Sequence, residues 1–298
     1  TTPYRPPVIQ TTPYRPPVIQ TTPYRPPVRP LAPYRPPIQA YSSQQYRPPG
    51  PSPPVIPVLP PPPPPPASPV AKTYMIAVGT NYAGTPAALP GCEEDLAAMV
   101  PLFRELYAIT EEHILLGRGS QRAVLLATLR RVLGGMVTGD RLIFYYSGHG
   151  TQVRDANGDE VDRLDECILT QDYQSAGYIV DDELGALWNL APSGASIVTI
   201  FDSCCSATVA DISPGAVTGP SMLSISGCVD NATSDSVYSA GTWRGALSVR
   251  LQAMLRANPQ YTIETLVSAL NIDLAASGLT QRTQYTVKGL NHTFPWPV

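Results

Sequence analysis

Several features are absent from this chain of 298 residues, and each absence excludes a class of protein. No stretch reaches the ~18–20 uncharged apolar residues of a membrane-spanning helix, so we expect no membrane association. The first thirty residues lack the apolar core of a signal peptide. The five cysteines include no C-x-x-C pair, which argues against a structural zinc site. An odd number of cysteines without a signal peptide favours free thiols in a reducing compartment. We therefore expect a cytoplasmic protein, with the nucleus as an alternative.

Proline and charge are distributed unevenly, and the distribution predicts two regions. Residues 1–71 contain 27 of the 36 prolines and six arginines but no acidic residue. Residues 72–298 contain 14 basic and 23 acidic residues, and their formal charge is −9. Such an acidic body argues against nucleic-acid binding, which requires clustered Lys and Arg. We predict a proline-rich region over 1–71 and a folded domain over 72–298, which is long enough to bury a core.

The proline-rich region is repetitive. The sequence TTPYRPPVIQ occurs at 1–10 and again at 11–20, and seven consecutive prolines occupy 60–66. Proline fixes φ and has no N–H to donate, so such a segment samples polyproline II, and we expect it to be disordered. Its Y-R-P-P units are typical of ligands for SH3- or WW-type domains, which makes such a partner one interpretation. A flexible spacer or pro-segment is the other interpretation.

Residues 72–298 alternate between apolar strands and amphipathic helices. We expect strands at 73–78, 113–116, 141–146, 196–201, 222–226 and 284–288. We expect helices at 92–107, 121–133, 181–190, 243–257 and 263–277. This alternation predicts an α/β fold in which helices flank a mostly parallel six-stranded sheet. In such sheets the ligand site lies just beyond the carboxyl ends of the strands.

Two of these strand ends carry residues that suit nucleophilic chemistry. The third strand is followed by Ser147-Gly148-His149-Gly150, and the fourth by Asp202-Ser203-Cys204-Cys205-Ser206. A histidine beside a thiol can act as its base, and flanking glycines leave room for a substrate backbone. The alternative is a buried structural cysteine and a structural histidine in a glycine-rich turn.

The segments 146–150 (YSGHG) and 202–204 (DSC) resemble the two signature blocks of type I metacaspases, which are caspase-like cysteine peptidases. Further blocks in the matching order are 77–82 (AVGTNY), 89–95 (LPGCEED), 155–166, 181–183 (DDE) and 226–231 (SGCVDN). The similarity covers nearly all of 73–298 and extends to a proline-rich N-terminal region. It implies a caspase-like sheet and a peptidase that uses a Cys–His dyad.

The resemblance implies the role of each catalytic residue. His149 would be the base and Cys204 the nucleophile, because the family register is Asp-x-Cys; Cys205 is the alternative nucleophile. The backbone N–H groups of Gly150 and Cys204 would stabilise the oxyanion. The family usually has His and Gly where this chain has Cys205 and Ala207.

The resemblance also implies a specificity pocket and a metal site. Cys92, Asp95, Ser147 and Asp202 match the residues that line the family's pocket for the side chain before the scissile bond. Two carboxylates there would pair with Arg or Lys and would repel Asp. For Asp95, the alternative is a carboxylate that interacts with a helix N-terminus. The likeness further implies Ca²⁺ ligands at Asp165, Asp181, Asp182 and Asp211; the alternative is a solvated acidic loop.

These expectations describe a monomeric, calcium-dependent endopeptidase that cuts proteins or peptides after Arg or Lys. The alternative is a catalytically silent, metacaspase-like interaction protein that docks through its proline-rich arm. Each of the six arginines in 1–71 is followed by proline, which makes its peptide bond a poor substrate. The first cleavable basic residue is therefore Lys72, where we expect autoprocessing.

Overall fold

The computed structural model describes residues 70–155, 163–204, 209–211, 218–228, 234–239 and 241–289. Almost all of the proline-rich region lies outside these residues, so its expected disorder and its domain boundary stay predictions.

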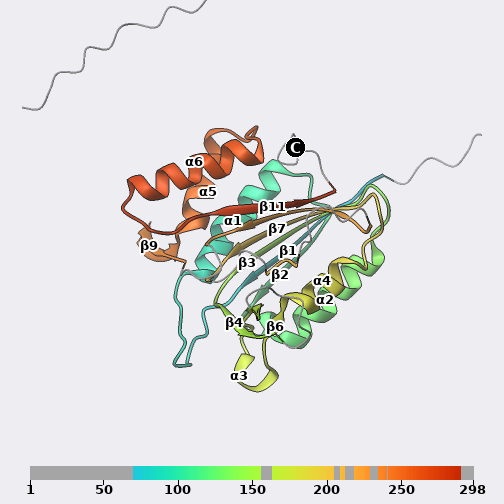
Figure 1. Ribbon diagram of the computed structural model, residues 1–298, viewed down its shortest axis with the longest axis horizontal. Helices are drawn as coiled ribbons and strands as arrows, with labels where there is room; N and C mark the ends of the chain where they lie inside the picture. The colour runs from blue at the N-terminus through green and yellow to red at the C-terminus, as the bar shows by residue number, and fades with distance from the viewer. Residues whose placement is uncertain are drawn as a thin grey trace, which may run out of the picture. The chain divides into compact units, whose positions relative to one another are not determined.

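The predicted six-stranded sheet is present (Figure 1). Its strands lie in the order β11, β8, β7, β3, β1, β2. All neighbours are parallel except β11, which runs antiparallel to β8 at one edge. The bounds are β1 (Thr73–Gly79), β2 (Glu111–Leu116), β3 (Arg141–Ser147), β7 (Ser196–Asp202), β8 (Ser221–Ser226) and β11 (Gln284–Lys288).

Helices cover both faces of this sheet because its strands carry apolar residues on both faces. Within β3, for example, Phe144 packs into one hydrophobic core and Tyr145 into the other, as the alternation of strand side chains requires. One core contains α2 (Arg122–Gly135) and α4 (Asp181–Trp188). The other contains α1 (Cys92–Leu106), α5 (Ala246–Ala257) and α6 (Ile263–Ala276) (Figure 1). None of the described helices is both long and apolar enough to cross a membrane.

Several short elements were not predicted. They are β4 (Gly150–Arg154), β5 (Leu164–Ile168) and β6 (Ile179–Val180), which form a small sheet, the hairpin of β9 (Ser236–Ser239) and β10 (Thr242–Gly245), the 3-10 turn η1 (Gly117–Ser120) and α3 (Tyr173–Ala176).

The hairpin corrects one prediction. A helix was expected to start at Trp243, but 242–245 pairs with β9 and helix α5 starts at Ala246. Trp243 is exposed and the next residue, Arg244, is buried, which is the alternation of a strand. This exchange of helix for strand brings Arg244 into the site described next.

Candidate active site

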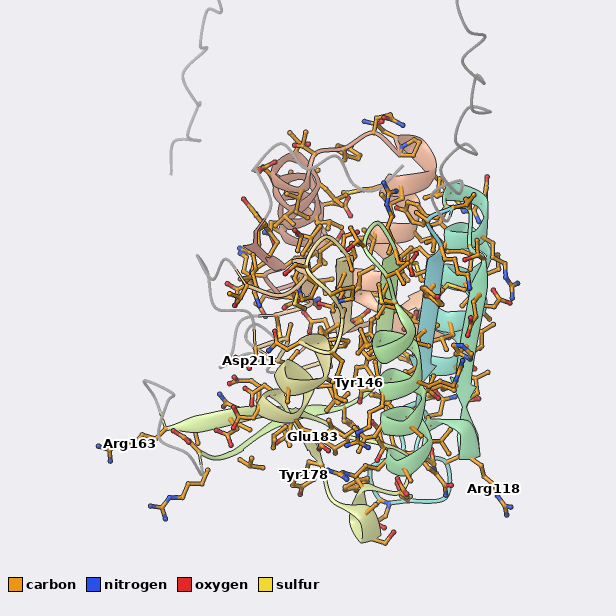
Figure 2. The ribbon with its side chains drawn as sticks, turned by 90° about the vertical axis from the view of Figure 1, so that its right-hand side faces the viewer. Arg118, Tyr146, Arg163, Tyr178, Glu183 and Asp211 are labelled. Carbon is orange, nitrogen blue, oxygen red and sulfur yellow. The ribbon has the colours of Figure 1, made fainter. Side chains whose placement is uncertain are left out.

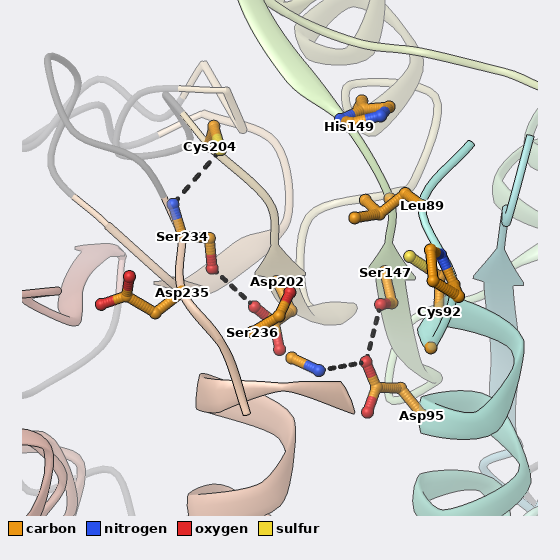
Figure 3. A pocket seen from close by; sticks show the side chains of 14 residues that line it. Leu89, Cys92, Asp95, Ser147, His149, Asp202, Cys204, Ser234, Asp235 and Ser236 are labelled. Carbon is orange, nitrogen blue, oxygen red and sulfur yellow. Dashed lines mark hydrogen bonds between the residues drawn. The ribbon is translucent and has the colours of Figure 1, made fainter. Parts of the chain in front are cut away.

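The carboxyl ends of the neighbouring strands β3 and β7 bring His149 and Cys204 to one place. Ser147, the last residue of β3, is in register with Asp202, the last residue of β7. His149 and Cys204 each follow their strand by two residues. Both line a pocket of about 270 Å³, one from each side, as Figure 3 shows. The two residues predicted at the strand ends therefore line one pocket.

The imidazole of His149 is oriented by a backbone carbonyl. Its Nε2 lies 2.9 Å from the carbonyl oxygen of Ala87. A carbonyl oxygen only accepts hydrogen bonds, so Nε2 carries the proton and Nδ1 of the neutral ring keeps its lone pair. Sequence reasoning named no orienting group for His149. A main-chain carbonyl from a loop 62 residues away gives no signal in side-chain patterns.

Two buried tyrosines fix the backbone of His149. The hydroxyl of Tyr82 accepts the His149 N–H at 2.9 Å, and the hydroxyl of Tyr146 lies 2.7 Å from the His149 carbonyl oxygen. The rings of Tyr82 and His149 are 4.8 Å apart. Tyr82 has a positive φ of 48°, which is uncommon for an aromatic residue, so the surrounding contacts hold it in that conformation. Burial raises the pKa of both hydroxyls well above the usual range, so both stay neutral.

Gly150 allows the histidine turn to touch the cysteine turn. A Cβ atom at position 150 would collide with the carbonyl oxygen of Cys204 and lie 3.3 Å from Cβ of Ser203. The backbone segments that carry Gly150 and Cys204 are therefore in direct contact. The two amides expected to form an oxyanion hole belong to these adjoining segments.

The thiol of Cys204 is half-buried and accepts a backbone hydrogen bond. The N–H of Ser234 lies 3.2 Å from its Sγ, and such a donor stabilises a thiolate. Among the described residues, the thiol and His149 are not hydrogen-bonded to each other; catalytic hydrogen bonds are often long before substrate binds. Cys205 and Ala207, the two departures from the family pattern, lie outside the described residues.

All four predicted pocket residues line the same cavity as His149 and Cys204. Asp95 comes from α1 and Asp202 from β7, and both side chains are buried. Asp95 accepts hydrogen bonds from the Ser147 hydroxyl (3.0 Å) and the Gly245 N–H (2.9 Å). Figure 3 shows both carboxylates below Cys204 and His149, at the inner end of the pocket.

Serine hydroxyls and one backbone amide satisfy the second carboxylate. Asp202 accepts hydrogen bonds from the hydroxyl of Ser234 (2.9 Å) and from both the N–H (2.9 Å) and the hydroxyl (2.6 Å) of Ser248. These serines were missed at the sequence level because isolated serines carry no motif. Their donors nevertheless explain how a carboxylate can stay buried here.

The electrostatics of the pocket follow from its burial. Burial and the nearby charge of Asp202 raise the pKa of Asp95 to about 7. Burial likewise raises the pKa of Asp202, against the hydrogen bonds from Ser248. The pKa of the Cys92 thiol is raised by burial too, so this cysteine stays protonated and contributes no charge.

Arg244 is a residue of this site that the sequence analysis missed. Its Nε lies 2.9 Å from Oδ1 of Asp95, and only 8% of its side chain is exposed. The expected helix at 243–257 would have placed it on a helical face. The sequence carries no signal for it, because in this hairpin the apolar Trp243 is exposed and the charged Arg244 is buried.

Three of the four predicted calcium ligands lie on adjoining elements, and the fourth is close to them. Asp165 is on β5, and Asp181 and Asp182 begin α4. The carboxylate of Asp211 contacts helix α4 at Gly185. Figure 2 labels Asp211. In the described part of the chain, no group of three or more His, Cys, Asp or Glu side chains is arranged to hold a metal. The acidic positions 156–162 are outside that part.

Lys72, the predicted autoprocessing residue, lies beside the first strand and far along the chain from the dyad. Its N–H donates to Oδ1 of Asp140 (2.8 Å), and its carbonyl accepts from the N–H of Arg141 (2.8 Å). The next N–H, of Thr73, donates to the hydroxyl of Thr110 (3.0 Å). The residues on both sides of the Lys72–Thr73 peptide bond are therefore held by backbone hydrogen bonds.

Comparison with known proteins supports the resemblance. The sequence model of the metacaspase peptidase C14 domain matches residues 74–213. Over 191 residues the chain is 33% identical to Metacaspase-1 of Schizosaccharomyces pombe, an alignment that covers 59% of this chain and 45% of that protein. Over 280 residues it is 26% identical to Metacaspase-1 of Mycosarcoma maydis, with 72% of this chain and 69% of that protein covered.

The fold comparison agrees. The crystal structure of a protein from Geobacter sulfurreducens has a TM-score of 0.60 and 24% identity and covers 74% of this chain and 94% of that one, which supports the fold alone. The alignments span less than half of the first two curated relatives, 45% and 37% of their lengths. The matching sequence model and several curated relatives of one kind show that this chain, over residues 74–213 above all, is similar to the metacaspase family of cysteine peptidases.

Proposed function

We propose that this protein is a cysteine endopeptidase that hydrolyses peptide bonds after Arg or Lys. The observation that carries the proposal is the pocket itself. Cys204 and His149 line its two sides, and the buried carboxylates Asp95 and Asp202 line its inner end. A pocket that joins a thiol, a base and two acids suits covalent catalysis on a substrate with a cationic side chain.

The bonding of His149 defines the proposed steps. Nδ1 accepts the proton of the Cys204 thiol, and the thiolate attacks the substrate carbonyl carbon. The N–H groups of Gly150 and Cys204 stabilise the resulting oxyanion. His149 then donates that proton to the leaving amine, which leaves an acyl-enzyme, and water hydrolyses the thioester with Nδ1 again acting as base. Nε2–H remains hydrogen-bonded to Ala87 throughout.

The carboxylates of Asp95 and Asp202 determine the proposed specificity. A guanidinium or ammonium group would pair with these buried carboxylates in a low-dielectric site. A substrate aspartate would be repelled by the same groups. Ser147 orients Asp95, and the neutral Cys92 supplies apolar wall.

We extend the proposal to calcium. Burial raises the pKa of Asp181 to about 7, and the neighbouring charges of Glu166 and Asp165 add to this effect. Carboxylates that destabilise one another's charge are chemically suited to a hard cation, and oxygen atoms are the ligands that Ca²⁺ prefers. Asp165, Asp181, Asp182 and Asp211 would hold the ion after moving closer together, because in the described structure no three of them are gathered around one point. When bound, it would neutralise this acidic cluster.

Paired fluorogenic peptides test the proposal. We compare substrates that differ only in the residue before the scissile bond, which is Arg, Lys or Asp. The Arg and Lys peptides should be hydrolysed, and the Asp peptide should not. Asp202→Ala should lower kcat/KM on the Arg peptide by a factor of about 10² or more, as for loss of one partner of a buried ion pair. Asp273→Ala, which removes a carboxylate from the remote pair with Arg250, is the matched control and should leave kcat/KM unchanged. Equal rates on Asp and Arg peptides would contradict the proposal.

The second candidate is a catalytically silent interaction protein that docks through the Y-R-P-P repeats. It predicts no turnover of any peptide, with or without Ca²⁺. The intact contacts around His149 favour the enzyme, because a silent protein has no need to keep Nδ1 free beside a thiol pocket.

A further inference from the structure

Arg244 is an internal cation held against the acidic pocket. Beyond its bond to Asp95, its Nη1 lies 3.2 Å from Oε1 of Gln252 on α5. Gln252 is itself anchored, because its amide donates to the carbonyl of Ala98 at 2.9 Å. The guanidinium is therefore fixed between helices α1 and α5. A substrate cation entering the pocket meets a carboxylate that already has a partner.

From the described residues, the two carboxylates accept equal numbers of hydrogen bonds, and they differ in the charge of one donor. Asp95 has three donors, of which Arg244 is cationic. Asp202 has three neutral donors, from Ser234 and Ser248. When both carboxylates are ionised, Asp95, Asp202 and Arg244 together carry one net negative charge, which Asp202 supplies; Asp235, which also lines the pocket, is the same in every variant below and is left out of this sum. Without Arg244 the sum would be two negative charges.

We infer that Arg244 is a specificity-determining residue. It neutralises Asp95, leaves Asp202 as the partner of the substrate cation, and sets the pocket to accept a single positive charge. This inference rests on the proposed function and names the charge state of the same site. Arg244 acts through Asp95 and does not touch the reacting atoms.

The groups that face Asp95 come from four elements. They are Cys92 on α1, Tyr145 on β3, Asp202 on β7 and Arg244 on β10. Arg244 is the one cation among these described groups. If Asp95 takes up a proton, the summed charge of Asp95, Asp202 and Arg244 becomes zero, because Asp202 and Arg244 then cancel. In Arg244→Met the same protonation leaves the negative charge of Asp202 in place.

The inference predicts that removing Arg244 restores activity to a variant that has lost one of the two carboxylates. Asp95→Asn removes the carboxylate partner of Arg244, brings the summed charge of the three groups to zero and should lower kcat/KM for an Arg peptide at least tenfold, mainly through KM. Adding Arg244→Met restores one net negative charge, so the double variant should regain most of that loss. Asp202→Asn should likewise be rescued in part by Arg244→Met, because Asp95 then becomes the free carboxylate. A purely structural Arg244 predicts double variants that are no better than the worse single variant.

The pH profile gives an independent measurement. In the wild-type protein, kcat/KM for the Arg peptide should fall as pH drops through about 7, where Asp95 becomes protonated. In Arg244→Met this fall should flatten, and in Arg244→Lys it should remain. Dividing each value by the rate of Cys204 alkylation by iodoacetamide removes the contributions of the thiol and of His149. Arg250→Met removes a partly exposed cation of α5 outside the pocket and should behave as wild type.

The outcomes separate the two claims. A wild-type protein that cleaves no Arg or Lys peptide would overturn the proposed function and this inference with it. The inference alone would be overturned by a different set of results. In that case the wild-type protein cleaves these peptides, Arg244→Met does not raise the kcat/KM of Asp95→Asn, and the pH profile of Arg244→Met equals that of the wild type. Circular dichroism and thermal unfolding of each variant identify any that fail to fold. If Arg244→Met fails to fold, the pH profile of kcat/KM in Arg244→Lys decides, because the inference predicts that it keeps the wild-type fall.

Discussion

Nε2 of His149 lies 2.9 Å from the carbonyl oxygen of Ala87, on a loop that no side-chain motif marks. The bond assigns the proton to Nε2 and leaves Nδ1 to exchange a proton with Cys204. Since the partner is a main-chain atom, substitution of Ala87 does not remove it. The orientation of His149 is better tested through the tyrosines that hold its own backbone.

Tyr82→Phe should lower both stability and turnover. The phenylalanine ring can still pack on His149, but the partly buried His149 N–H loses its acceptor, which costs about 1–3 kcal/mol. We expect a matching decrease in the free energy of unfolding in urea and a lower kcat, with KM much less affected. Tyr178→Phe, at a tyrosine that is 41% exposed, is the control. If Tyr82→Phe has the stability and kcat of the wild type, the Tyr82 hydroxyl does not position the His149 backbone.

Gly150→Ala should abolish activity. The added Cβ would collide with the carbonyl oxygen of Cys204, a backbone atom that cannot rotate away, so the histidine and cysteine turns must separate. Gly134→Ala is the matched control, because no atom lies near its Cβ position and alanine favours a helix by up to about 1 kcal/mol. Peptidase rates and melting temperatures check both variants. An active Gly150→Ala protein would contradict the close contact of the two turns.

The large elements could be predicted because their signals are local. Strand β3 reads as an apolar run since helices bury both of its faces, and this pattern gave the six strands and the positions of His149 and Cys204. The hairpin β9–β10 could not be predicted, because it has only four residues on each side and its stability comes from tertiary contacts. Because the hairpin was not predicted, the role of Arg244 was not predicted either. The role of Ala87 could not be predicted because it acts through its main-chain carbonyl alone.

Activity should require roughly millimolar Ca²⁺, at the weak end of protein calcium sites. Asp182→Ala removes one of the proposed ligands and should raise the required concentration or abolish activation. Glu105→Ala removes an exposed carboxylate that pairs with Arg256 and should leave the calcium dependence unchanged. Titration of peptide hydrolysis with CaCl₂ measures the requirement. Full activity of the wild-type protein in excess EGTA would contradict a calcium requirement.

Calcium-treated protein should acquire a new N-terminus at Thr73. The arginines of 1–71 are each followed by proline, whereas Lys72 precedes threonine. Its backbone is hydrogen-bonded to Asp140 and Arg141, so the start of β1 must fray before the bond can enter a pocket. We therefore expect slow cleavage that Lys72→Gln prevents. N-terminal sequencing decides, and termini at Pro6, Pro16 or Pro48 would contradict this prediction.

The central claim is that Cys204 is the nucleophile of a peptidase specific for basic residues. The most direct measurement compares hydrolysis of an Arg-ending fluorogenic peptide by the wild-type, Cys204→Ala and Cys205→Ala proteins in millimolar Ca²⁺. An Arg-based covalent inhibitor should in parallel be mapped by peptide digestion. The account predicts no turnover in Cys204→Ala, substantial turnover in Cys205→Ala and modification of Cys204. Turnover by Cys204→Ala, or modification that maps to Cys205, would contradict it.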